Sequence, residues 1–337
     1  MLSLKLRSAS VAGVVIAAIS TTTVANAVDD VVVALPTAAI NFAVFYVADT
    51  GGFYKKHGLN VATRLVPGPA AANAVAAGSS DFSASSGLTL VRAVAKGAPL
   101  ISVAEINSEI DVRVIVTKKA LAEMGITATS SFQDRIRALK GRTIAIDAVS
   151  GIPDGVFRYV LKQGGLSSND LNITPLQSDA MLAALQTNRI DGIAFLSPTT
   201  IQAELAGNVV LIREPAGEQA LSALSPFPYT VLITNTETCR KRPNVCANMI
   251  AALKETRTFL STNTKEAVEM LKKNFPALSA ELIEDTLRQA LTGMRADLKI
   301  SEKSFERVEQ FSKSVGFLQD NESIPPSNKL YNGDYNK

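Results

Sequence analysis

The feature that most constrains the fold is an alternation, through most of the chain, of short apolar runs and amphipathic segments. Apolar runs of strand length occupy 29–35, 60–65, 143–147 and 191–196, and segments with helical periodicity lie between such runs, bounded by Gly, Pro and Ser. Strands that alternate with helices in this way are typical of parallel sheets covered by helices. The alternation therefore predicts an α/β protein with largely parallel sheets.

Two similar strand candidates predict that the chain passes between two lobes twice. The run at 229–234 resembles the run at 112–117, so we expect crossings near residues 117 and 229. The later segments are mostly helical and should return to cover the first lobe, whereas the polar end should be extended or frayed. The expected division is a signal segment at 1–27, a first lobe at 28–117 plus 231–318, a second lobe at 118–230 and a polar C-terminal tail at 319–337.

The N-terminus has the features of a secretory signal peptide. Lys5 and Arg7 precede an apolar stretch at 9–19, and the small-x-small sequence at 25–27 ends with Ala27. A membrane anchor is the alternative, but the apolar stretch is shorter than the roughly 20 residues that a bilayer span requires. We therefore expect cleavage after Ala27 and a soluble, exported protein in the periplasm that begins at Val28.

Composition excludes two broad classes of protein. The chain has 337 residues, 47% of them hydrophobic and 19% charged, which is typical of a globular chain and not of a disordered one. The net charge of +3 falls to +1 without the signal segment, which carries two cations and no acid. No excess of positive charge remains for binding phosphates, so we expect no nucleic-acid partner.

Cys239 and Cys246 are the only cysteines, and a turn-like stretch containing Pro243 separates them. Export makes a disulfide between them chemically permissible, and two free thiols are the alternative. A metal site is poorly supported because the only histidine, His57, is far from both cysteines in the sequence.

The sequence offers little for catalysis or for a cofactor. His57 precedes a glycine at an expected helix end, where a solvated side chain is the simplest interpretation. The motifs Gly-x-Ser-x-Gly, His-Glu-x-x-His and Gly-x-Gly-x-x-Gly are absent, as is a phosphate loop ending in Gly-Lys-Ser. We therefore expect a protein that is not an enzyme and that holds no cofactor and no metal.

Hydroxyl-bearing and aromatic residues gather at the points where expected strands run into helices. Ser83, Ser85 and Ser86 precede one helix, and Ser150, expected to cap its helix, and Gly151 precede another. Such junctions bind anionic oxygens through hydroxyls and free backbone N–H groups, although an ordinary helix N-cap is the commoner role. Both would contribute to one site if they faced the same cleft, because ligands of open α/β sheets bind beyond the carboxyl ends of the strands.

Aromatic and further polar residues complete the expected ligand site. Phe45 and Tyr46 are expected in the core. Pairing with a substrate anion is the alternative for four arginines that are expected on the solvated surface, which are Arg92, Arg113, Arg142 and Arg158. The candidate ligand-binding residues are Thr37, Asn41, Phe42, Ser83, Ser85, Ser86, Ser150, Gly151, Phe195, Ser197 and Tyr229.

An ordered series of short segments resembles the solute-binding proteins of nitrate, sulfonate and taurine ABC importers. The segment at 43–61 resembles the family's first helix, that at 77–82 its Gly-x-x-Asp-Phe step, and that at 95–99 its Lys-Gly-x-Pro turn. The segments at 139–145 and 188–192 resemble its entry into the second lobe and its later Gly-x-Ile-Asp-Ala step, where Gly192 replaces Ala. The likeness extends over about 31–275, and no single segment is specific by itself.

The resemblance implies a two-lobed periplasmic binding protein of type II (the Venus-flytrap fold) with two hinge crossovers. It implies capture of a small organic or inorganic anion, such as a sulfonate, nitrate, taurine or an aromatic carboxylate, and delivery to an inner-membrane permease with its ATPase. The alternatives are a pyrimidine-precursor binding protein or enzyme of the same superfamily, and a receptor that signals to a membrane protein. Nothing in the sequence indicates a stable oligomer, so a monomer is expected.

Overall fold

The structure is a computed structural model that describes residues 28–319 and 321–336. The expected signal segment at 1–27 lies outside the described residues. In the described part of the chain, no helix combines the length and the apolar character that crossing a membrane requires.

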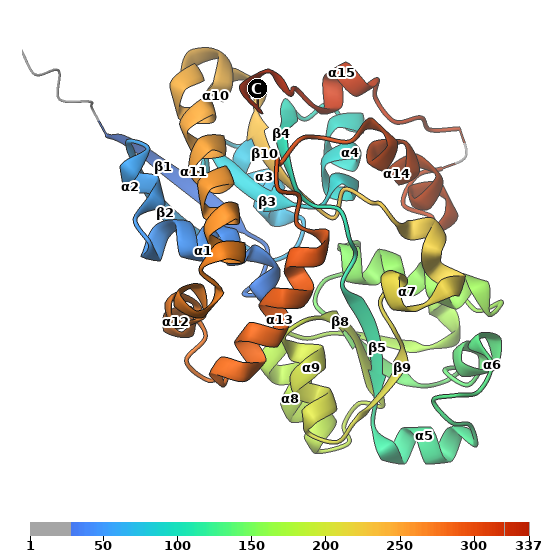
Figure 1. Ribbon diagram of the computed structural model, residues 1–337. Coiled ribbons are helices and arrows are strands. Elements are labelled where there is room, and N and C mark those ends of the chain that lie inside the picture. Colours follow the sequence, from blue (N-terminus) through green and yellow to red (C-terminus); the bar gives the residue numbers. More distant parts are fainter. Residues whose placement is uncertain (1–27, 320, 337) are drawn as a thin grey trace, which may run out of the picture.

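The first lobe is built on a five-stranded sheet in the order β2-β1-β3-β10-β4 (Figure 1). β1 pairs in parallel with β2 and β3, whereas β10 is antiparallel to both of its neighbours. The strands are β1 (Asp29–Leu35), β2 (Leu59–Leu65), β3 (Phe82–Ser85), β4 (Leu100–Asn107) and β10 (Thr230–Asn235).

The second lobe has its own five-stranded sheet, in the order β7-β6-β8-β5-β9. β6 pairs in parallel with β7 and β8, and β5 is antiparallel to β8 and β9. The strands are β5 (Val112–Val116), β6 (Thr143–Ile146), β7 (Asn172–Pro175), β8 (Gly192–Leu196) and β9 (Val209–Ile212).

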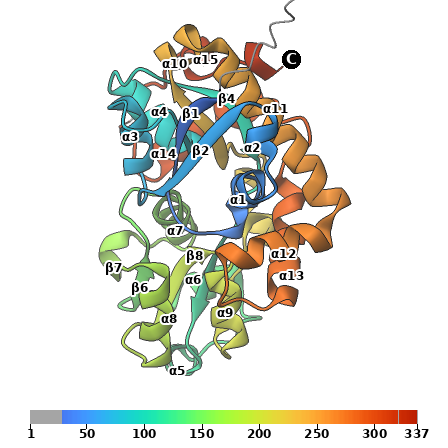
Figure 2. The ribbon, with the colours of Figure 1, turned by 90° about the vertical axis from the view of Figure 1, so that its left-hand side faces the viewer.

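Helices cover both faces of each sheet, and the two lobes lie one above the other (Figures 1 and 2). The helices of the first lobe are α1 (Ala43–Thr50), α2 (Phe53–Lys56), α3 (Ala70–Ala76), α4 (Gly87–Ala95), α10 (Thr236–Lys241), α11 (Pro243–Thr262), α12 (Thr264–Asn274), α13 (Ala280–Gly293), α14 (Glu302–Ser314) and α15 (Ser327–Leu330). Those of the second lobe are α5 (Lys118–Met124), α6 (Phe132–Arg137), α7 (Ile152–Gln163), α8 (Ser178–Gln186) and α9 (Thr199–Leu205). This architecture is the two-lobed α/β fold that we expected.

The position of the first crossing was predicted wrongly. The strand at 112–117 was expected to close the first lobe, but β5 lies in the second sheet, where it pairs with β8 and β9. The chain therefore crosses at 108–111, and it returns ahead of β10. Every residue of β5 is buried, so its apolar pattern is compatible with either sheet.

The polar C-terminal tail was expected to be extended or frayed, and this prediction was also wrong. Leu330 is buried in the first lobe, Tyr331 forms a β-bridge with Ser102, and Asn336 Nδ2 donates to the Leu298 carbonyl at 2.6 Å. The tail is held in place by its pairing with β4. The composition of the tail does not reveal this contact.

The structure joins Cys239 in α10 to Cys246 in α11 by a disulfide, with a Cα–Cα distance of 5.5 Å. Both cysteines are buried, and the Tyr335 hydroxyl donates to the Cys239 carbonyl at 3.3 Å. The disulfide thus links two consecutive helices of the first lobe at a point where the tail also packs.

Candidate functional site

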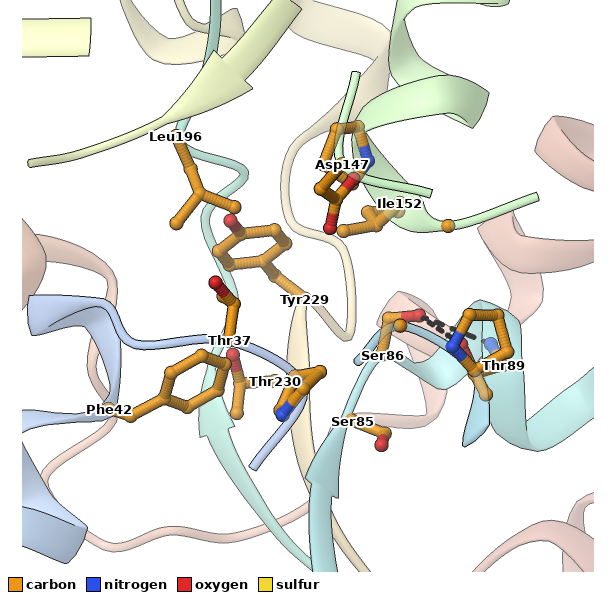
Figure 3. A pocket seen from close by; sticks show the side chains of 15 residues that line it. Thr37, Phe42, Ser85, Ser86, Thr89, Asp147, Ile152, Leu196, Tyr229 and Thr230 are labelled. Atoms are coloured by element: carbon orange, nitrogen blue, oxygen red, sulfur yellow. Dashed lines mark hydrogen bonds between the residues drawn. The ribbon is translucent and has the colours of Figure 1, made fainter. Parts of the chain in front are cut away.

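A cavity lies between the two lobes, and residues of both lobes form its wall. It encloses about 490 Å³ of space free of protein atoms, part of it open to solvent. Figure 3 shows Leu196, Asp147 and Ile152 on one side of it, and Thr37 and Phe42 on the other. The lining residues are Pro36, Thr37, Phe42, Gly68, Pro69, Ser85, Ser86, Thr89, Asp147, Gly151, Ile152, Pro153, Leu196, Tyr229 and Thr230.

On the first lobe, the wall is the junction at which β3 runs into α4. The Ser86 hydroxyl caps α4 by accepting from the Thr89 backbone N–H at 3.1 Å, and it also lies 3.0 Å from the Thr89 hydroxyl (Figure 3). Ser85 lies one residue earlier and pairs with the deeper Ser83 hydroxyl at 3.3 Å. The capping groups of this junction therefore bond to one another.

Gly87 allows a close approach of the hinge to this junction. Its backbone N–H donates to the Pro228 carbonyl at 2.7 Å, and a Cβ at this position would lie 2.5 Å from Pro228 Cγ. Only glycine fits here without displacing Pro228. The contact holds the segment that carries Tyr229 against the start of α4.

On the second lobe, the wall is the junction at which β6 runs into α7. Asp147 directly follows β6, and its Oδ1 atom is buried without a hydrogen-bond partner in the described structure. Burial raises the pKa of the Asp147 carboxyl to about 6, opposed by backbone N–H groups at 147 and 148 and assisted by the negative charge of Asp154. This junction therefore holds a carboxyl whose Oδ1 atom, though not the whole group, lacks a hydrogen-bond partner in the described structure.

Ser150 does not cap α7, as we had expected. The N-cap is Gly151, without a side-chain bond, and Ser150 lies one residue earlier at a φ of 65°. The Ser150 N–H donates to the buried Asp154 Oδ2 at 2.7 Å, and its carbonyl accepts from Arg92 Nη1 at 3.0 Å. Arg92 is on α4, so this bond joins the two lobes and Arg92 is not simply a surface residue.

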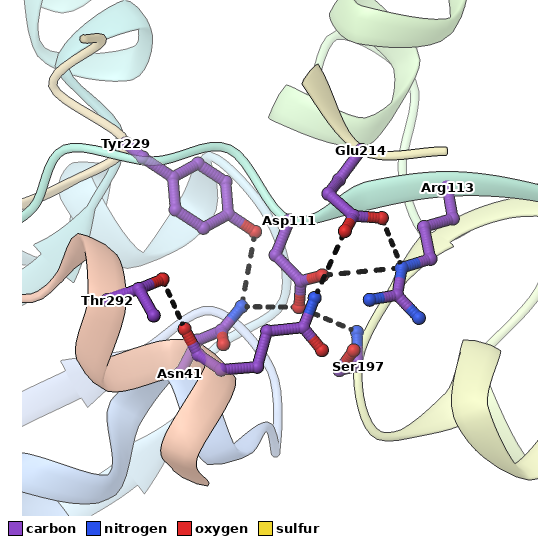
Figure 4. Close-up of polar contacts among 8 residues, drawn as sticks. Asn41, Asp111, Arg113, Ser197, Glu214, Tyr229 and Thr292 are labelled. Atoms are coloured by element: carbon purple, nitrogen blue, oxygen red, sulfur yellow. Dashed lines mark hydrogen bonds and ion pairs between the residues drawn. The ribbon is translucent and has the colours of Figure 1, made fainter. Parts of the chain in front are cut away.

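A polar network lies at the hinge, behind Tyr229 (Figure 4). Asn41 Nδ2 donates to Asp111 Oδ2 at 3.2 Å and lies 3.5 Å from the Tyr229 hydroxyl, while the Ser197 backbone N–H donates to the same Asp111 oxygen at 3.1 Å. Asp111 thus contacts both lobes from the crossing segment. Burial raises the pKa of Asp111 although the nearby Arg113 opposes the shift, and burial beside Asp111 raises the pKa of Tyr229.

Arg113 is drawn away from the cavity by another partner. Its Nε donates to Glu214 Oε2 at 2.7 Å and lies 4.0 Å from Asp111 Oδ1. Gln289 Nε2 donates to the other oxygen of Glu214 at 3.4 Å. The guanidinium is therefore held in the hinge network.

The predicted site residues divide into two groups in the structure. The residues on the cavity wall are Thr37, Phe42, Ser85, Ser86, Gly151 and Tyr229, and those off it are Asn41, Ser83, Ser150, Phe195 and Ser197. Asn41 and Ser197 are in the hinge network, Ser83 is fully buried beneath Ser85, and Ser150 lines a neighbouring groove with Arg92. Whether the wall residues contact a ligand stays a prediction.

Phe195 was misplaced because side chains of a strand alternate between its two faces. Phe195 is 2% exposed in the core, and its neighbour Leu196 lines the cavity instead. Sequence reasoning also missed Asp147, Thr89 and the prolines of the wall. A signal existed for Asp147, because it ends an expected strand at the edge where open α/β sheets bind ligands.

Comparison with known proteins gives the family and the fold. The profile described as NMT1/THI5 like matches residues 39–267. No curated protein matches the chain. Among solved structures, a protein of Bordetella bronchiseptica RB50 is 19% identical with a TM-score of 0.79, over 91% of this chain and 95% of that one.

Two further similar structures have titles that name a ligand. The alkanesulfonate-binding protein SsuA of Xanthomonas axonopodis pv. citri, bound to MOPS, is 16% identical with a TM-score of 0.70, over 90% of this chain and 98% of that one. The periplasmic nitrate-binding protein NrtA of Synechocystis PCC 6803 is 15% identical with a TM-score of 0.71, over 91% of this chain and 86% of that one. The likeness confirms the two-lobed fold of periplasmic binding proteins, and the chain belongs to the NMT1/THI5-like family.

Proposed function

We propose that the protein is the solute-binding component of an ABC importer, which captures a small molecule between its lobes and delivers it to a permease and its ATPase. The observation that carries the proposal is the cavity wall, to which both lobes contribute around a hinge that the chain crosses twice. A ligand that touches both lobes favours the closed arrangement over the open one, because it loses contacts when they separate.

Polar contacts between the lobes would contribute to a closed state. Arg92 on α4 binds the Ser150 carbonyl of the second lobe, and Asp111 joins Asn41 to Ser197 across the hinge. These are few polar bonds, of the kind that contribute about 1 kcal/mol each, so a ligand's own contacts can decide the balance between open and closed states.

We also propose that the mature protein begins at Val28 and works as a monomer in the periplasm. Support comes from the signal-like sequence at 1–27 and from the periplasmic relative that binds nitrate. N-terminal sequencing of the exported protein tests the cleavage site, and light scattering tests the oligomeric state.

We further propose that the protein binds its ligand without converting it to a product. The lining residues that the structure describes include neither Cys nor His, and two of the similar structures with ligands in their titles are binding proteins. Mass spectrometry of ligand released after long incubation should recover it unchanged. Recovery of a product would instead favour an enzyme.

The similar structures suggest a sulfonate or nitrate as the ligand, and the sequence resemblance adds taurine and aromatic carboxylates. The wall hydroxyls of Thr37, Ser85 and Ser86 would serve the oxygens of such compounds as donors. Small-angle scattering of the protein from Val28 with each compound class tests the proposal. A saturable decrease in the radius of gyration supports closure around a solute. If no class of compound binds or changes the radius, the proposal is wrong.

A further inference from the structure

The charged lining of the cavity is negative only. Asp147 is the only acid among the lining residues that the structure describes, and that set includes no Lys, Arg or His. A second carboxyl, Asp111, lies behind Tyr229. The space between the lobes is therefore bordered by negative charge without a facing cation.

Asp147 is directed into this space. Figure 3 shows its carboxyl pointing from the second lobe toward the gap that Ser86 and Tyr229 border on the other side. The Oδ1 atom is buried and accepts no hydrogen bond within the described structure. A buried acceptor without a partner is costly, and such groups in native proteins usually mark a missing ligand, ion or water.

Arg92 and Arg158, on α4 and α7, are engaged elsewhere, and Lys96 lines the neighbouring groove with Arg92. Arg92 donates to the Ser150 carbonyl and its guanidinium lies 4.7 Å from the centre of the Phe317 ring. Arg158 Nε donates to Asp154 Oδ1 at 2.9 Å. Neither guanidinium is thus bonded to the Asp147 carboxyl, which leaves that carboxyl for a donor from outside the protein.

We propose that the ligand presents a nitrogen with N–H bonds, as an ammonium or amidinium group, to the Asp147 carboxyl. Its remaining part packs against Phe42, Ile152 and Leu196, which supply apolar surface from both lobes. The inference rests on the proposed function and narrows its ligand class, because taurine is the only compound named there that carries such a nitrogen. An anionic group placed at the same position would face a carboxylate with no neutralising partner, which disfavours it strongly at low dielectric.

A ligand-side comparison tests the inference without altering the protein. Calorimetric titration at pH 7.5 of the protein from Val28 uses probes that share a phenyl ring: benzamidine, neutral benzamide and benzoate, whose substituents are planar, and benzenesulfonate, whose substituent is tetrahedral. We expect benzamidine to bind at least about tenfold more tightly than benzamide, because charge-assisted hydrogen bonds are about twice as strong as neutral ones. Benzoate and benzenesulfonate should bind more weakly still.

A matched pair of variants tests the residue. Asp147→Asn keeps the shape of the side chain and removes its charge, so the preference for benzamidine over benzamide should disappear. Asp285→Asn makes the same change of charge on an exposed side chain of α13 and should keep that preference.

Three outcomes would overturn the inference. Tighter binding of benzoate or benzenesulfonate than of benzamidine would do so and leave the proposed function standing. Equal loss of benzamidine binding in both variants would show a general charge effect. Absence of saturable benzamidine binding also overturns it, and the proposed function fails with it only if scattering detects no closure with any compound class.

Discussion

The two walls of the cavity are alike in secondary structure and differ in how their polar groups are satisfied. Each is a strand that runs into a helix, β3 into α4 and β6 into α7. In the first, Ser86 caps the helix and bonds to Thr89. In the second, Asp147 has an oxygen without a partner and Ser150 has a positive φ. The polar groups of the first junction bond to one another, whereas the second keeps an acceptor without a partner among the described residues and a residue at positive φ, and such groups often mark function.

The largest effect should come from adding a methyl group to each wall. Gly87→Ala places a Cβ 2.5 Å from Pro228 Cγ, whereas the nearest atom to a Cβ in Gly151→Ala is the Ala148 carbonyl oxygen at 3.2 Å. We expect Gly87→Ala to lower the free energy of unfolding by about 3 kcal/mol, because overpacking displaces the hinge, and Gly151→Ala to lower it by less. Urea denaturation measures both. Equal losses would mean that the walls are packed alike.

Asp147→Asn should stabilise the ligand-free protein. The pKa of the Asp147 carboxyl is about 6 in the folded state and 3.8 ordinarily, so folding takes up a proton at pH values between the two. The wild type therefore loses free energy of unfolding as the pH rises from about 4 through about 6. The shift corresponds to about 2 to 3 kcal/mol, present above pH 6. The variant should remove this loss.

Thermal unfolding of both proteins between pH 4 and 8 measures this difference. The groups around Asp147 are Asp154 and Tyr229, with Arg92 on the facing helix. Burial also raises the pKa of Glu105 to about 6. Glu105 changes the pH dependence of stability equally in both proteins, so its effect cancels in the comparison. Parallel pH profiles for wild type and variant would contradict the prediction.

Loss of the disulfide should lower the stability of the protein without changing its affinity for ligand. The double variant Cys239→Ser with Cys246→Ser opens a short loop between α10 and α11, away from both walls, and should lower the free energy of unfolding by about 2 kcal/mol. Titration with benzamidine should give the same affinity as the wild type. A changed affinity at a temperature where both proteins are folded would show that the walls depend on this remote link.

The smallest effect concerns the cap of the first wall. Ser86→Ala removes the bond to the Thr89 N–H and should cost about 1 kcal/mol of unfolding free energy. Ser150→Ala is the matched control, because the Ser150 side chain caps no helix, and should cost less. Differential scanning calorimetry gives both values, and a larger loss for Ser150→Ala would reverse the assignment of caps.

Local features were predictable because they depend on residues a few positions apart. The strand at 143–147 was expected and is observed as β6, and the Cys239–Cys246 pair forms the disulfide that the short spacing allowed. Six of the expected site residues lie on the wall for a similar reason, since residues at the carboxyl ends of strands gather at one edge of a sheet. The prediction of Phe195 failed by one position, because strand periodicity gives alternation but not which face is the core.

The sequence by itself determined the α/β pattern and the existence of two passages between lobes, and it made the disulfide permissible, because these features follow from periodicity, turns and short spacings. Only the tertiary structure decided that β5 joins the second sheet, that the tail packs on β4, and that Asp147 faces the cavity without a cation. These depend on which distant segments meet. The charge of the cavity wall depends on residues of α4, β6 and the hinge, which are tens of residues apart in the sequence. It also depends on the hydrogen bonds of Arg92 to the Ser150 carbonyl and of Arg113 to Glu214, which hold these side chains off the wall.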